Sequence, residues 1–582
     1  MWFEAGGQSL GECEDALQTA RAWLKQGKIL AVKGLGGFHL VCDATNPAAV
    51  TELRKRKRRS DKPFGLMAFD IEAVSWHCFL SEEDKVLLQS PAHPIVLLER
   101  KPESTIAPES APYQHSLVIM LPYTPLHLLL LEPEPGFPDV LVMTSGNLSE
   151  EPIAYEDSDA RSRLVDMADG FLMHNRPIHM RVDDSVVRSL MAPYPHEDGY
   201  KAKPYFVRRS RGYAPNPLKL PEELPSVLAA GAELKNTFCL TRQDYAFVSH
   251  HIGDLENYET LRSFEEGVAH YERLFRITPE RIACDLHPNY LASRYAQERA
   301  ARQGLPLVQV QHHHAHLAAC LAENGWTSQE PVIGLAFDGT GLGTDGAIWG
   351  GEFLLGCYQG YQRLYHLAYA PLPGCDLSVR KPARMALAHL WQSGLDWEGD
   401  LPPTKGLCME ERTALRAQLE HHINTPNTSS MGRLFDAVSA LLGVRQAASY
   451  EGQAAMELEA LADPNETGSY SFAIQAGIID PQPVLEELIA AWRAAVPLPT
   501  LSARFHNSLV NMSLEVCQAI RRSSGAVTVA LSGGVWQNQF LLRHILQPLK
   551  DAGFQVLIHH LLPPNDGCIA LGQALIAAKA SL

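Results

Sequence analysis

Two histidines lie four residues apart at the start of an apolar segment, in Gln311-His312-His313-His314-Ala315-His316. The leucines and alanines that follow favour a helix, which would place His312 and His316 one turn apart on the same face. Two imidazoles in that geometry can hold one metal ion. A polar helix start with exposed rings is the alternative explanation of the pair.

A glycine-rich loop favours the metal interpretation. Asp338-Gly339-Thr340-Gly341 ends an expected strand at 332–338. A carboxylate in that place can hold a metal ion or water, and the backbone amides after it can hold phosphate. A second expected strand, 527–531, ends in Ser532-Gly533-Gly534, and Asn538 follows where a helix would contact a base or ribose. Two such loops predict two related lobes that clasp one nucleotide.

Two more segments would complete this site. Asp436 lies on an expected helix that starts near Gly432, and its alternative role is that of an ordinary surface acid. Asp566 precedes a glycine and an apolar helix, where it serves either as an N-cap or as a third metal ligand with His312 and His316. Two imidazoles and one carboxylate fit Fe(II) or Zn(II).

The N-terminal third carries a second group of charged residues. Six basic residues run from Arg54 to Arg59, and Lys62 follows closely. Lys33 ends an apolar segment before a glycine loop, and Thr144-Ser145-Gly146-Asn147 ends another. Loop amides opposed by lysine and arginine side chains suit a triphosphate. A solvated basic surface is the alternative for the basic run.

The composition limits the class of protein. The 582 residues are 46% hydrophobic and 20% charged, which is ordinary for a globular chain of several domains. A net charge of −16 argues against a general nucleic-acid binder. The eleven cysteines form no C-x-x-C pair, so we expect reduced thiols in a cytoplasmic protein. No signal peptide is evident, and prolines interrupt the most apolar stretch, 116–131, so no membrane span is expected.

Apolar strands alternate with helical segments, which predicts an α/β fold. The stretch 376–525 is expected to be mostly helical, and the proline-rich stretch 191–225 reads as a connection between domains. Further strands are expected at 28–33, 64–69, 95–98, 140–143, 227–230, 237–241, 246–250 and 281–285.

The N-terminal motifs together resemble the YrdC-like domain over residues 15–205. They are the segments 33–45, 54–64, 144–147 and 175–185. That family binds ATP and a carbamate-type substrate and forms an acyl-adenylate with loss of pyrophosphate. The resemblance implies a twisted α/β domain that uses Mg²⁺ with its ATP. It also implies catalytic roles for Lys33, Arg54 and Lys62, and nucleotide contacts from Ser145, Asn147 and Arg181.

The C-terminal motifs resemble the carbamoyltransferase module related to the tRNA threonylcarbamoyl transferases, which is a two-lobed actin-like ATPase (ASKHA) domain. The resemblance implies a catalytic role for Asp338 and one transition metal ion, Fe or Zn, on His312, His316 and Asp566. The nucleotide contacts it implies are Gly339, Gly341, Gly432, Asp436, Gly533, Gly534 and Asn538.

A YrdC-like module followed by this carbamoyltransferase module resembles the HypF family of [NiFe]-hydrogenase maturation. The resemblance implies an ATP-dependent ligase-type transferase that forms carbamoyl-adenylate from carbamate or carbamoyl phosphate. The carbamoyl group would pass to the C-terminal cysteine thiol of HypE, towards the cyanide ligands. The expected domains are a residual tail at 1–14, the YrdC-like domain at 15–205, a linker at 206–225 and the transferase domain at 226–582.

Members of that family begin with an acylphosphatase domain and a zinc-finger pair, and no such motif precedes residue 12. We therefore expect a fragment that cannot cleave carbamoyl phosphate by itself. Three alternatives stay open at this point: a fused threonylcarbamoyl-adenosine enzyme acting on tRNA, an actin-like kinase or ATPase, and a non-catalytic scaffold.

Overall fold

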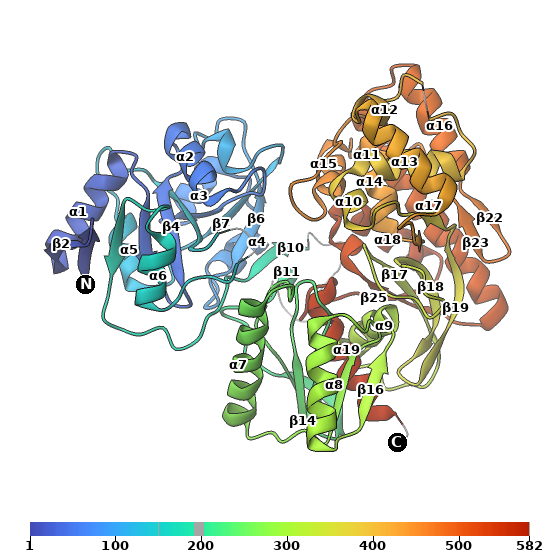
Figure 1. Cartoon of the computed structure of the whole chain (residues 1–582), viewed down its shortest axis with the longest axis horizontal. Helices are drawn as coiled ribbons and strands as arrows, with labels where there is room; N and C mark the ends of the chain where they lie inside the picture. Colours follow the sequence, from blue (N-terminus) through green and yellow to red (C-terminus); the bar gives the residue numbers. More distant parts are fainter. Residues whose placement is uncertain (149–150, 191–202, 398, 581–582) are drawn as a thin grey trace.

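The computed structural model describes residues 1–148, 151–190, 203–397 and 399–580. The N-terminal α/β domain lies beside a C-terminal half made of two lobes (Figure 1). The first lobe holds the helices α7 to α9 and α19, and the second holds the helices α10 to α18. None of the helices in the described residues has the length and apolar character needed to cross a membrane.

An eleven-stranded mixed sheet forms the centre of the N-terminal domain. Asn46 caps α2 with Pro47 at the first helical position, and Thr124 caps α5 in the same way before Pro125. The helices are α1 (Cys13–Lys25), α2 (Pro47–Lys57), α3 (Ile71–His77), α4 (Glu82–Leu88), α5 (Pro125–Leu131) and α6 (Asp157–Leu164), with the short η1 (Pro108–Ser110). The strands in spatial order are β11 (Pro204–Arg208), β10 (Val186–Ser189), β6 (Ile95–Glu99), β7 (Ser116–Met120), β5 (Gly65–Ala68), β8 (Val140–Ser145), β4 (Phe38–Asp43), β3 (Leu30–Lys33), β9 (Gly170–Met173), β1 (Trp2–Ala5) and β2 (Gln8–Glu12).

Residues 1–14, expected to be a tail, supply two strands of this sheet and the first two residues of α1. The strands β1 and β2 form a hairpin, and β1 pairs with β9. Gly6 and Gly7 make the turn with φ of +56° and +76°, which glycine adopts without strain. The side chain of Phe3 is fully buried against Trp23. Its burial explains why the segment packs on the domain.

The expected linker at 206–225 also contributes strands. The strand β11 pairs with β10 of the first domain, and β12 (Leu218–Leu224) pairs with β14 (Cys239–Val248) of the first lobe. Leu218 and Leu220 alternate with exposed residues and bury on the lobe, as a half-buried strand requires. Residues 191–202 of the expected connection lie outside the described residues.

The first lobe has a five-stranded sheet in the order β12, β14 (Cys239–Val248), β13 (Val227–Ala229), β15 (Arg281–Asp285) and β16 (Leu307–Val310). The two strands expected at 237–241 and 246–250 are one strand, β14. Gln243 lies within it at φ +53°, beside a register shift against β12. The helices are α7 (Tyr258–Phe275), α8 (Leu291–Gln303), α9 (His312–Glu323) and α19 (Ile569–Lys579).

The second lobe has a seven-stranded sheet in which β17 and β24 are parallel neighbours. The loops after these two strands therefore emerge at the same edge. The strands in order are β22 (Ala473–Gln475), β23 (Ile478–Asp480), β19 (Gly360–Leu367), β18 (Gly351–Cys357), β17 (Val332–Phe337), β24 (Thr528–Ser532) and β25 (Gln555–Leu557), with β20 (Ala370–Pro371) and β21 (Asn427–Thr428) as a separate pair.

Helices cover this sheet, and the stretch 376–525 is mostly helical as expected. They are α10 (Asp376–Arg380), α11 (Pro382–Gln392), α12 (Pro402–Lys405), α13 (Met409–His421), α14 (Met431–Leu441), α15 (Gln453–Leu461), α16 (Gln482–Arg493), α17 (Leu498–Ser524) and α18 (Gln539–Asp551), with the short helix η2 (Gly534–Gln537). The short helix η3 (Asp566–Cys568) packs instead on α9 and α19.

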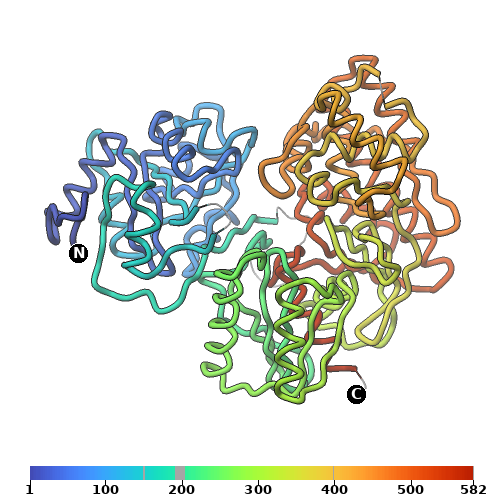
Figure 2. The backbone as a smooth tube through the Cα atoms, in the orientation of Figure 1, coloured from blue at the N-terminus to red at the C-terminus, as the bar shows by residue number. Residues whose placement is uncertain are grey.

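The helix α9 lies between the two lobes and packs along α19, which returns to the first lobe from the far end of the chain (Figure 2). The two helices approach closely at a glycine. An ideal Cβ at Gly572 would lie 1.9 Å from the carbonyl oxygen of Ala315. This contact fixes α19 against the part of α9 that carries the histidines.

Candidate metal and transfer site

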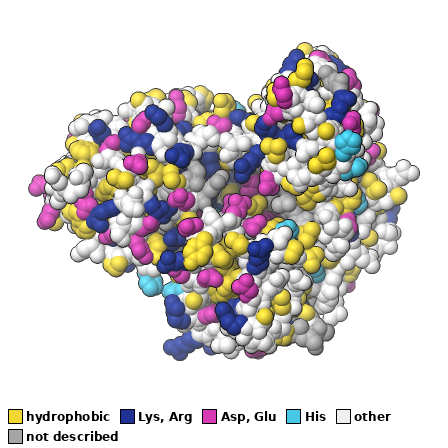
Figure 3. All heavy atoms as spheres, viewed as in Figure 1, with side chains coloured by type: hydrophobic (Ala, Val, Ile, Leu, Met, Phe, Trp, Pro, Cys, Tyr) yellow, Lys and Arg dark blue, Asp and Glu magenta, His cyan; other side chains and the backbone are white. Residues whose placement is uncertain are grey.

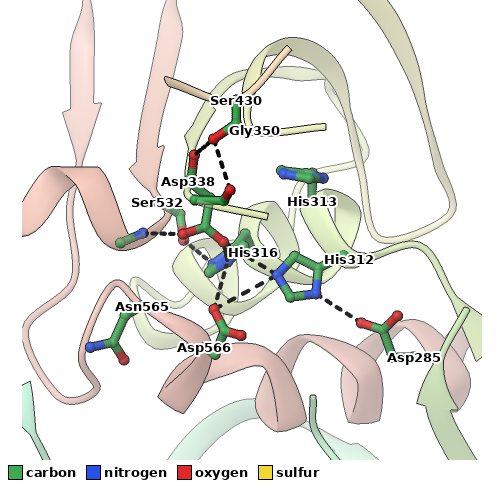
Figure 4. Close-up of polar contacts among 12 residues, drawn as sticks. Asp285, His312, His313, His316, Asp338, Gly350, Ser430, Ser532, Asn565 and Asp566 are labelled. Atoms are coloured by element: carbon green, nitrogen blue, oxygen red, sulfur yellow. Dashed lines mark hydrogen bonds and ion pairs between the residues drawn. The ribbon is translucent and has the colours of Figure 1, made fainter. Parts of the chain in front are cut away.

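Four side chains from three separate segments meet between the lobes (Figure 4). His312 and His316 come from α9, Asp338 follows β17, and Asp566 opens η3 ahead of α19. All four are buried, and one ligand atom from each lies within 4.8 Å of the others. The three predicted metal ligands therefore lie together. Asp338, predicted as a catalytic residue, joins them.

The two imidazole rings present the same nitrogen to the centre of the group. Nε2 of His312 and of His316 lie 3.3 and 3.2 Å from Oδ2 of Asp338. The same nitrogens lie 3.7 and 3.9 Å from Oδ1 of Asp566. Two imidazole nitrogens and two carboxylate oxygens are a donor set that suits Zn(II) or Fe(II). The residues present therefore fit a divalent transition metal ion.

Each outward-facing Nδ1 has its own partner. Nδ1 of His312 lies 2.8 Å from Oδ2 of Asp285, and Nδ1 of His316 lies 3.1 Å from Oγ of Ser532. A histidine that donates from one ring nitrogen keeps the other free to bind a metal. Asp285 was not predicted from the sequence. Its signal was its place at the end of β15, the parallel neighbour of the strand that leads into α9.

The electrostatics reflect an excess of buried carboxylates. Burial opposes protonation of His312, but the facing carboxylates of Asp566 and Asp285 raise its pKa well above the ordinary value. Burial likewise opposes ionisation of Asp338, yet hydrogen bonds from the two histidines lower its pKa well below the ordinary range. Burial and the charge of Asp338 raise the pKa of Asp566. Protons on these groups thus neutralise part of the negative charge of the buried carboxylates. A bound divalent cation would neutralise that charge in their place.

Local sequence positions these ligands. Gln311 caps α9, because its Oε1 accepts a hydrogen bond from the backbone N–H of His314 at 2.9 Å. The backbone N–H of Gly534 donates to Oδ1 of Asp338 at 3.0 Å. Gly533 has φ +105°, and an ideal Cβ there would lie 2.2 Å from the carbonyl oxygen of Phe337. Only glycine fits at residue 533, so the loop after β24 can approach Asp338.

The predicted glycines of the phosphate loops surround Asp338. An ideal Cβ at Gly432 would lie 3.0 Å from Cα of Gly339, so the start of α14 contacts the loop after β17. Gly341 faces the rings of His312 and His313. The structure thus brings the loops after β17 and β24 and the start of α14 to one place. Nucleotide binding by these glycines stays a prediction.

Two predicted nucleotide contacts have other partners in the structure. Asn538 caps α18 by accepting from the backbone N–H of Leu541 at 2.8 Å, and its Nδ2 contacts Nε2 of His506 at 2.9 Å. Both ends of this amide are therefore used inside the protein. Asp436 lies 2.8 Å from Nε of Arg433, and burial raises its pKa to about 6. Its role as a ribose contact stays a prediction.

In the N-terminal domain, Ser145 and Asn147 are held by a lysine that was not singled out from the basic run. Nζ of the buried Lys57 donates to the carbonyl oxygens of both residues and to Oδ1 of Asn147, each at 2.6 Å. Lys33, also buried, pairs with Asp157 at 2.6 Å and donates to the carbonyl oxygen of His174 at 3.1 Å. Lys33 and Lys57 are thus buried beside the two glycine-containing loops, which follow β3 and β8.

The other predicted residues of this domain differ in exposure and partners. Arg54 donates to the backbone carbonyls of Ser60 at 2.8 Å and Lys62 at 3.1 Å, so it organises the loop that follows α2. Desolvation by the surrounding protein, and then the charge of Arg59, lower the pKa of Lys62 to about 8, although its side chain is exposed. Arg181 lies over the ring of Tyr155, 5.0 Å from its centroid.

Comparison with known proteins decides the family. The chain is 42% identical to carbamoyltransferase HypF2 of Cupriavidus necator over 97% of its own length and 73% of that protein. It is 44% identical to carbamoyltransferase HypF of Rhodobacter capsulatus over 99% of its own length and 75% of that protein. The chain belongs to the HypF carbamoyltransferase family. The expected resemblance is confirmed, and the chain is a carbamoyltransferase.

The HypF assignment extends to the fold and to each part of the chain. A crystal structure of full-length HypF in the phosphate- and nucleotide-bound form matches with a TM-score of 0.90 and 41% identity, covering 99% of this chain and 73% of that one. The Sua5–YciO–YrdC profile, described as telomere recombination, matches residues 22–195. The HypF Kae1-like domain matches 222–323, and the second subdomain of the carbamoyltransferase Kae1-like domain matches 334–573.

In this chain the N-terminal domain contacts the second lobe through Asp61. Oδ2 of Asp61 accepts from Nε2 of Gln453 at 3.0 Å, and from Arg445 and Ser449 at 3.4 Å each. Beside this contact, the segments 100–115 and 444–461 line a groove of about 610 Å³. Figure 3 shows a hollow between these parts of the molecule, with charged side chains around it.

Proposed function

We propose that this chain uses ATP to form carbamoyl-adenylate in its N-terminal domain and transfers the carbamoyl group in its C-terminal half. The acceptor that we propose is the C-terminal cysteine thiol of HypE, on the way to the cyanide ligands of [NiFe]-hydrogenase. The observation that carries the proposal is that one HypF chain holds both a buried lysine-flanked pair of glycine loops and a four-ligand site between two lobes.

For the first step, the N-terminal domain supplies positive charge and backbone donors. Lys33 and Lys57 are buried beside the loops that follow β3 and β8, and the basic run of α2 lies next to them. A carbamate oxygen would attack the α-phosphorus of Mg²⁺-bound ATP, and pyrophosphate would leave. Fixed cations that face the phosphates stabilise the charge that develops in such a step.

For the second step, His312, His316, Asp338 and Asp566 would hold one Fe(II) or Zn(II) ion. When bound, such an ion supplies a positive centre that can polarise a carbonyl or orient a phosphate. The glycine loops around Asp338 would hold the AMP phosphate. The HypE cysteine would lose its thiol proton to solvent, and its sulfur would form a bond to the carbamoyl carbon while the carbon–oxygen bond to AMP breaks. AMP leaves, and the thiocarbamate stays on HypE.

The contact between the N-terminal domain and the second lobe suits an intermediate that water hydrolyses. Carbamate and its adenylate are short-lived, so the two steps benefit from a passage that excludes bulk water. Lys62 and Asp61 lie in the same loop, and that loop contacts the second lobe through Arg445 and Gln453. Carbamoyl phosphate is the alternative source of the carbamoyl group.

Intact mass of HypE tests the proposal directly. The chain is incubated with ATP, Mg²⁺, HypE and a source of the carbamoyl group, which is either carbamoyl phosphate or bicarbonate together with ammonia. The intact mass of HypE is then measured by mass spectrometry. A gain of one carbamoyl group on the C-terminal cysteine supports the proposal, and a HypE variant with serine there is the matched control. An unmodified HypE together with threonylcarbamoylated tRNA in a parallel reaction would overturn it.

A further inference from the structure

We propose that Glu323, His559 and Ser532 are positioning residues that hold His316 in the orientation and tautomer needed to bind a metal ion. They form one buried chain of hydrogen bonds that ends on Nδ1 of His316. The inference rests on the proposed metal site, and it assigns a function to three side chains that do not touch that site's centre.

The chain of contacts is continuous and excluded from solvent. Oγ of Ser532 lies 3.1 Å from Nδ1 of His316 and 2.8 Å from Nε2 of His559. Nδ1 of His559 lies 2.9 Å from Oε2 of Glu323. The side chains of His559 and Glu323 are both 0% exposed. The contacts thus join the metal-facing ring to a fully buried carboxylate.

The direction of every hydrogen bond follows from the metal. Nε2 of His316 faces Asp338 and Asp566, so metal binding requires that nitrogen without a proton. Nδ1 of His316 then carries the proton and donates to Ser532. The Ser532 hydroxyl is left to donate to Nε2 of His559, so the proton of His559 is on Nδ1. That nitrogen donates to Glu323, which ends the chain as an acceptor.

Glu323 is able to end the chain because its second oxygen is also satisfied. Oε1 accepts from the backbone N–H groups of His560 and Leu561, the latter at 3.2 Å. Three donors therefore stabilise the ionised carboxylate without solvent. A carboxylate can only accept here, and this fixes the order of donors back to His316. If every hydrogen bond ran in the opposite direction, Nδ1 of His559 would have to accept a proton from Glu323. An ionised carboxylate has no proton to donate.

Both ends of the chain lie on α9. His316 and Glu323 are seven residues apart, which is about two turns, so they lie on the same face of the helix. Ser532 ends β24, and His559 follows β25. The chain thus connects α9 to the neighbouring strand ends at two points. His312, in contrast, has its carboxylate partner Asp285 in direct contact.

Cys568 is the other group near Nδ1 of His316, at 3.4 Å. Burial, followed by the charge of Glu323, raises the pKa of this thiol well above its ordinary value, so it stays neutral. A thiol is a weak hydrogen-bond partner compared with a hydroxyl. Cys568 also lies 4.0 Å from Oγ of Ser532, so it provides a control that touches both groups weakly but does not link Ser532 to His559 or Glu323.

The test measures metal affinity and stability separately. The metal-free full chain and its variants are titrated with Zn²⁺ alone against a competing chelator, and thermal unfolding of each metal-free protein is recorded. We expect Ser532→Ala and His559→Ala to weaken Zn²⁺ binding about 10- to 100-fold, as loss of a ligand's outer partner does. We expect His559→Gln to restore affinity to within severalfold of the wild type, because its carbonyl can accept from Ser532.

Two controls separate positioning from mere packing. His506→Ala removes another fully buried, doubly hydrogen-bonded histidine and should lower the unfolding temperature without changing Zn²⁺ affinity. Cys568→Ala should leave affinity within severalfold of the wild type. Wild-type affinity in both Ser532→Ala and His559→Ala would overturn the inference, even if both unfold at lower temperature. A wild-type chain that binds no Zn²⁺ or Fe²⁺ would instead overturn the proposed metal site itself.

Discussion

Gly572 of α19 faces the carbonyl oxygen of Ala315 of α9 so closely that no β-carbon fits between them; an ideal Cβ would lie 1.9 Å from that oxygen. The two helices carry or adjoin three of the four ligands, because His312 and His316 are on α9 and Asp566 lies just before α19. The spacing of two helix backbones therefore sets the distance between the histidines and the carboxylate.

Gly572→Ala should destabilise the chain and reduce its metal content. The added methyl group forces α9 and α19 apart, and overpacking of this kind costs about 1–3 kcal/mol or more. Thermal unfolding and elemental analysis measure the two effects. Gly360→Ala is the control, since a Cβ there would meet nothing within 4 Å. Equal unfolding temperatures for both variants would contradict the prediction.

His316→Ala should remove the metal ion of the transfer site and leave the adenylating step intact. The substitution removes one of the two imidazole ligands. Residue 316 belongs to the C-terminal half, whereas Lys33 and Lys57 belong to the N-terminal domain. We expect metal stoichiometry to fall from near one per chain to near zero, with ATP–pyrophosphate exchange within twofold of wild type. An unchanged stoichiometry would count against this ligand set.

Asp61→Ala should uncouple the two steps. The side chain accepts three hydrogen bonds from the second lobe at 3.0 to 3.4 Å, and it is partly exposed, so we expect a loss of about 1–2 kcal/mol of interdomain interaction. That loss corresponds to about a tenfold decrease in the equilibrium constant for contact between the N-terminal domain and the second lobe. ATP–pyrophosphate exchange should persist, while carbamoyl groups transferred per ATP consumed should fall.

The control for Asp61 is Glu82→Ala, since the Glu82 carboxylate is 84% exposed and pairs with Lys85 of its own helix. This variant should keep the wild-type ratio of carbamoyl groups transferred to ATP consumed. If Asp61→Ala also keeps that ratio, contact between the domains is not needed for transfer.

His127→Leu should weaken the dependence of stability on pH. Burial, and then the nearby His39, lower the pKa of His127 to about 3. Asp184, Arg211 and His174 also face it. Below its ordinary pKa the unfolded chain binds a proton here while the folded chain does not, so stability falls as pH falls. From about pH 7.5 to about pH 5.5 this histidine alone should cost about 1.4 kcal/mol.

Urea unfolding at both pH values measures that difference. The Leu variant should lose about 1.4 kcal/mol less than the wild type on acidification. His421→Leu, at an exposed position, should behave like the wild type. A wild-type pH dependence in the His127 variant would show that this ring does not titrate on unfolding.

Sequence patterns predicted the parts of this molecule that depend on local rules. Helix periodicity predicted that His312 and His316 share one face. The apolar runs of two strands predicted that Asp338 and Ser532 lie at strand ends. The strands expected at 28–33, 64–69, 95–98 and 140–143 are present, with ends shifted by no more than two residues. Strand ends predicted the position of the site because parallel neighbours present their loops at one edge.

The rest depends on contacts between distant segments. Asp285 and His312 are 27 residues apart, and Glu323 and His559 are 236 apart, so no short motif marks either pair. Lys57 could not be separated from five basic neighbours, although it alone of the six is fully buried. The hairpin of β1 and β2 lacked a long apolar run, and its burial depends mainly on Phe3.

The return of α19 to the first lobe governs how this protein is made. A ribosome releases the strands and helices of that lobe, then the whole second lobe, and only then the helix that covers the sheet of β13, β14 and β15. The N-terminal domain can fold before the first lobe has been synthesised, because domains generally fold as units. The first lobe must wait with an uncovered apolar face until translation reaches residue 579. Its histidines meet Asp566 at the same late moment, so a nascent chain cannot assemble its metal site until Asp566 and α19 have been synthesised.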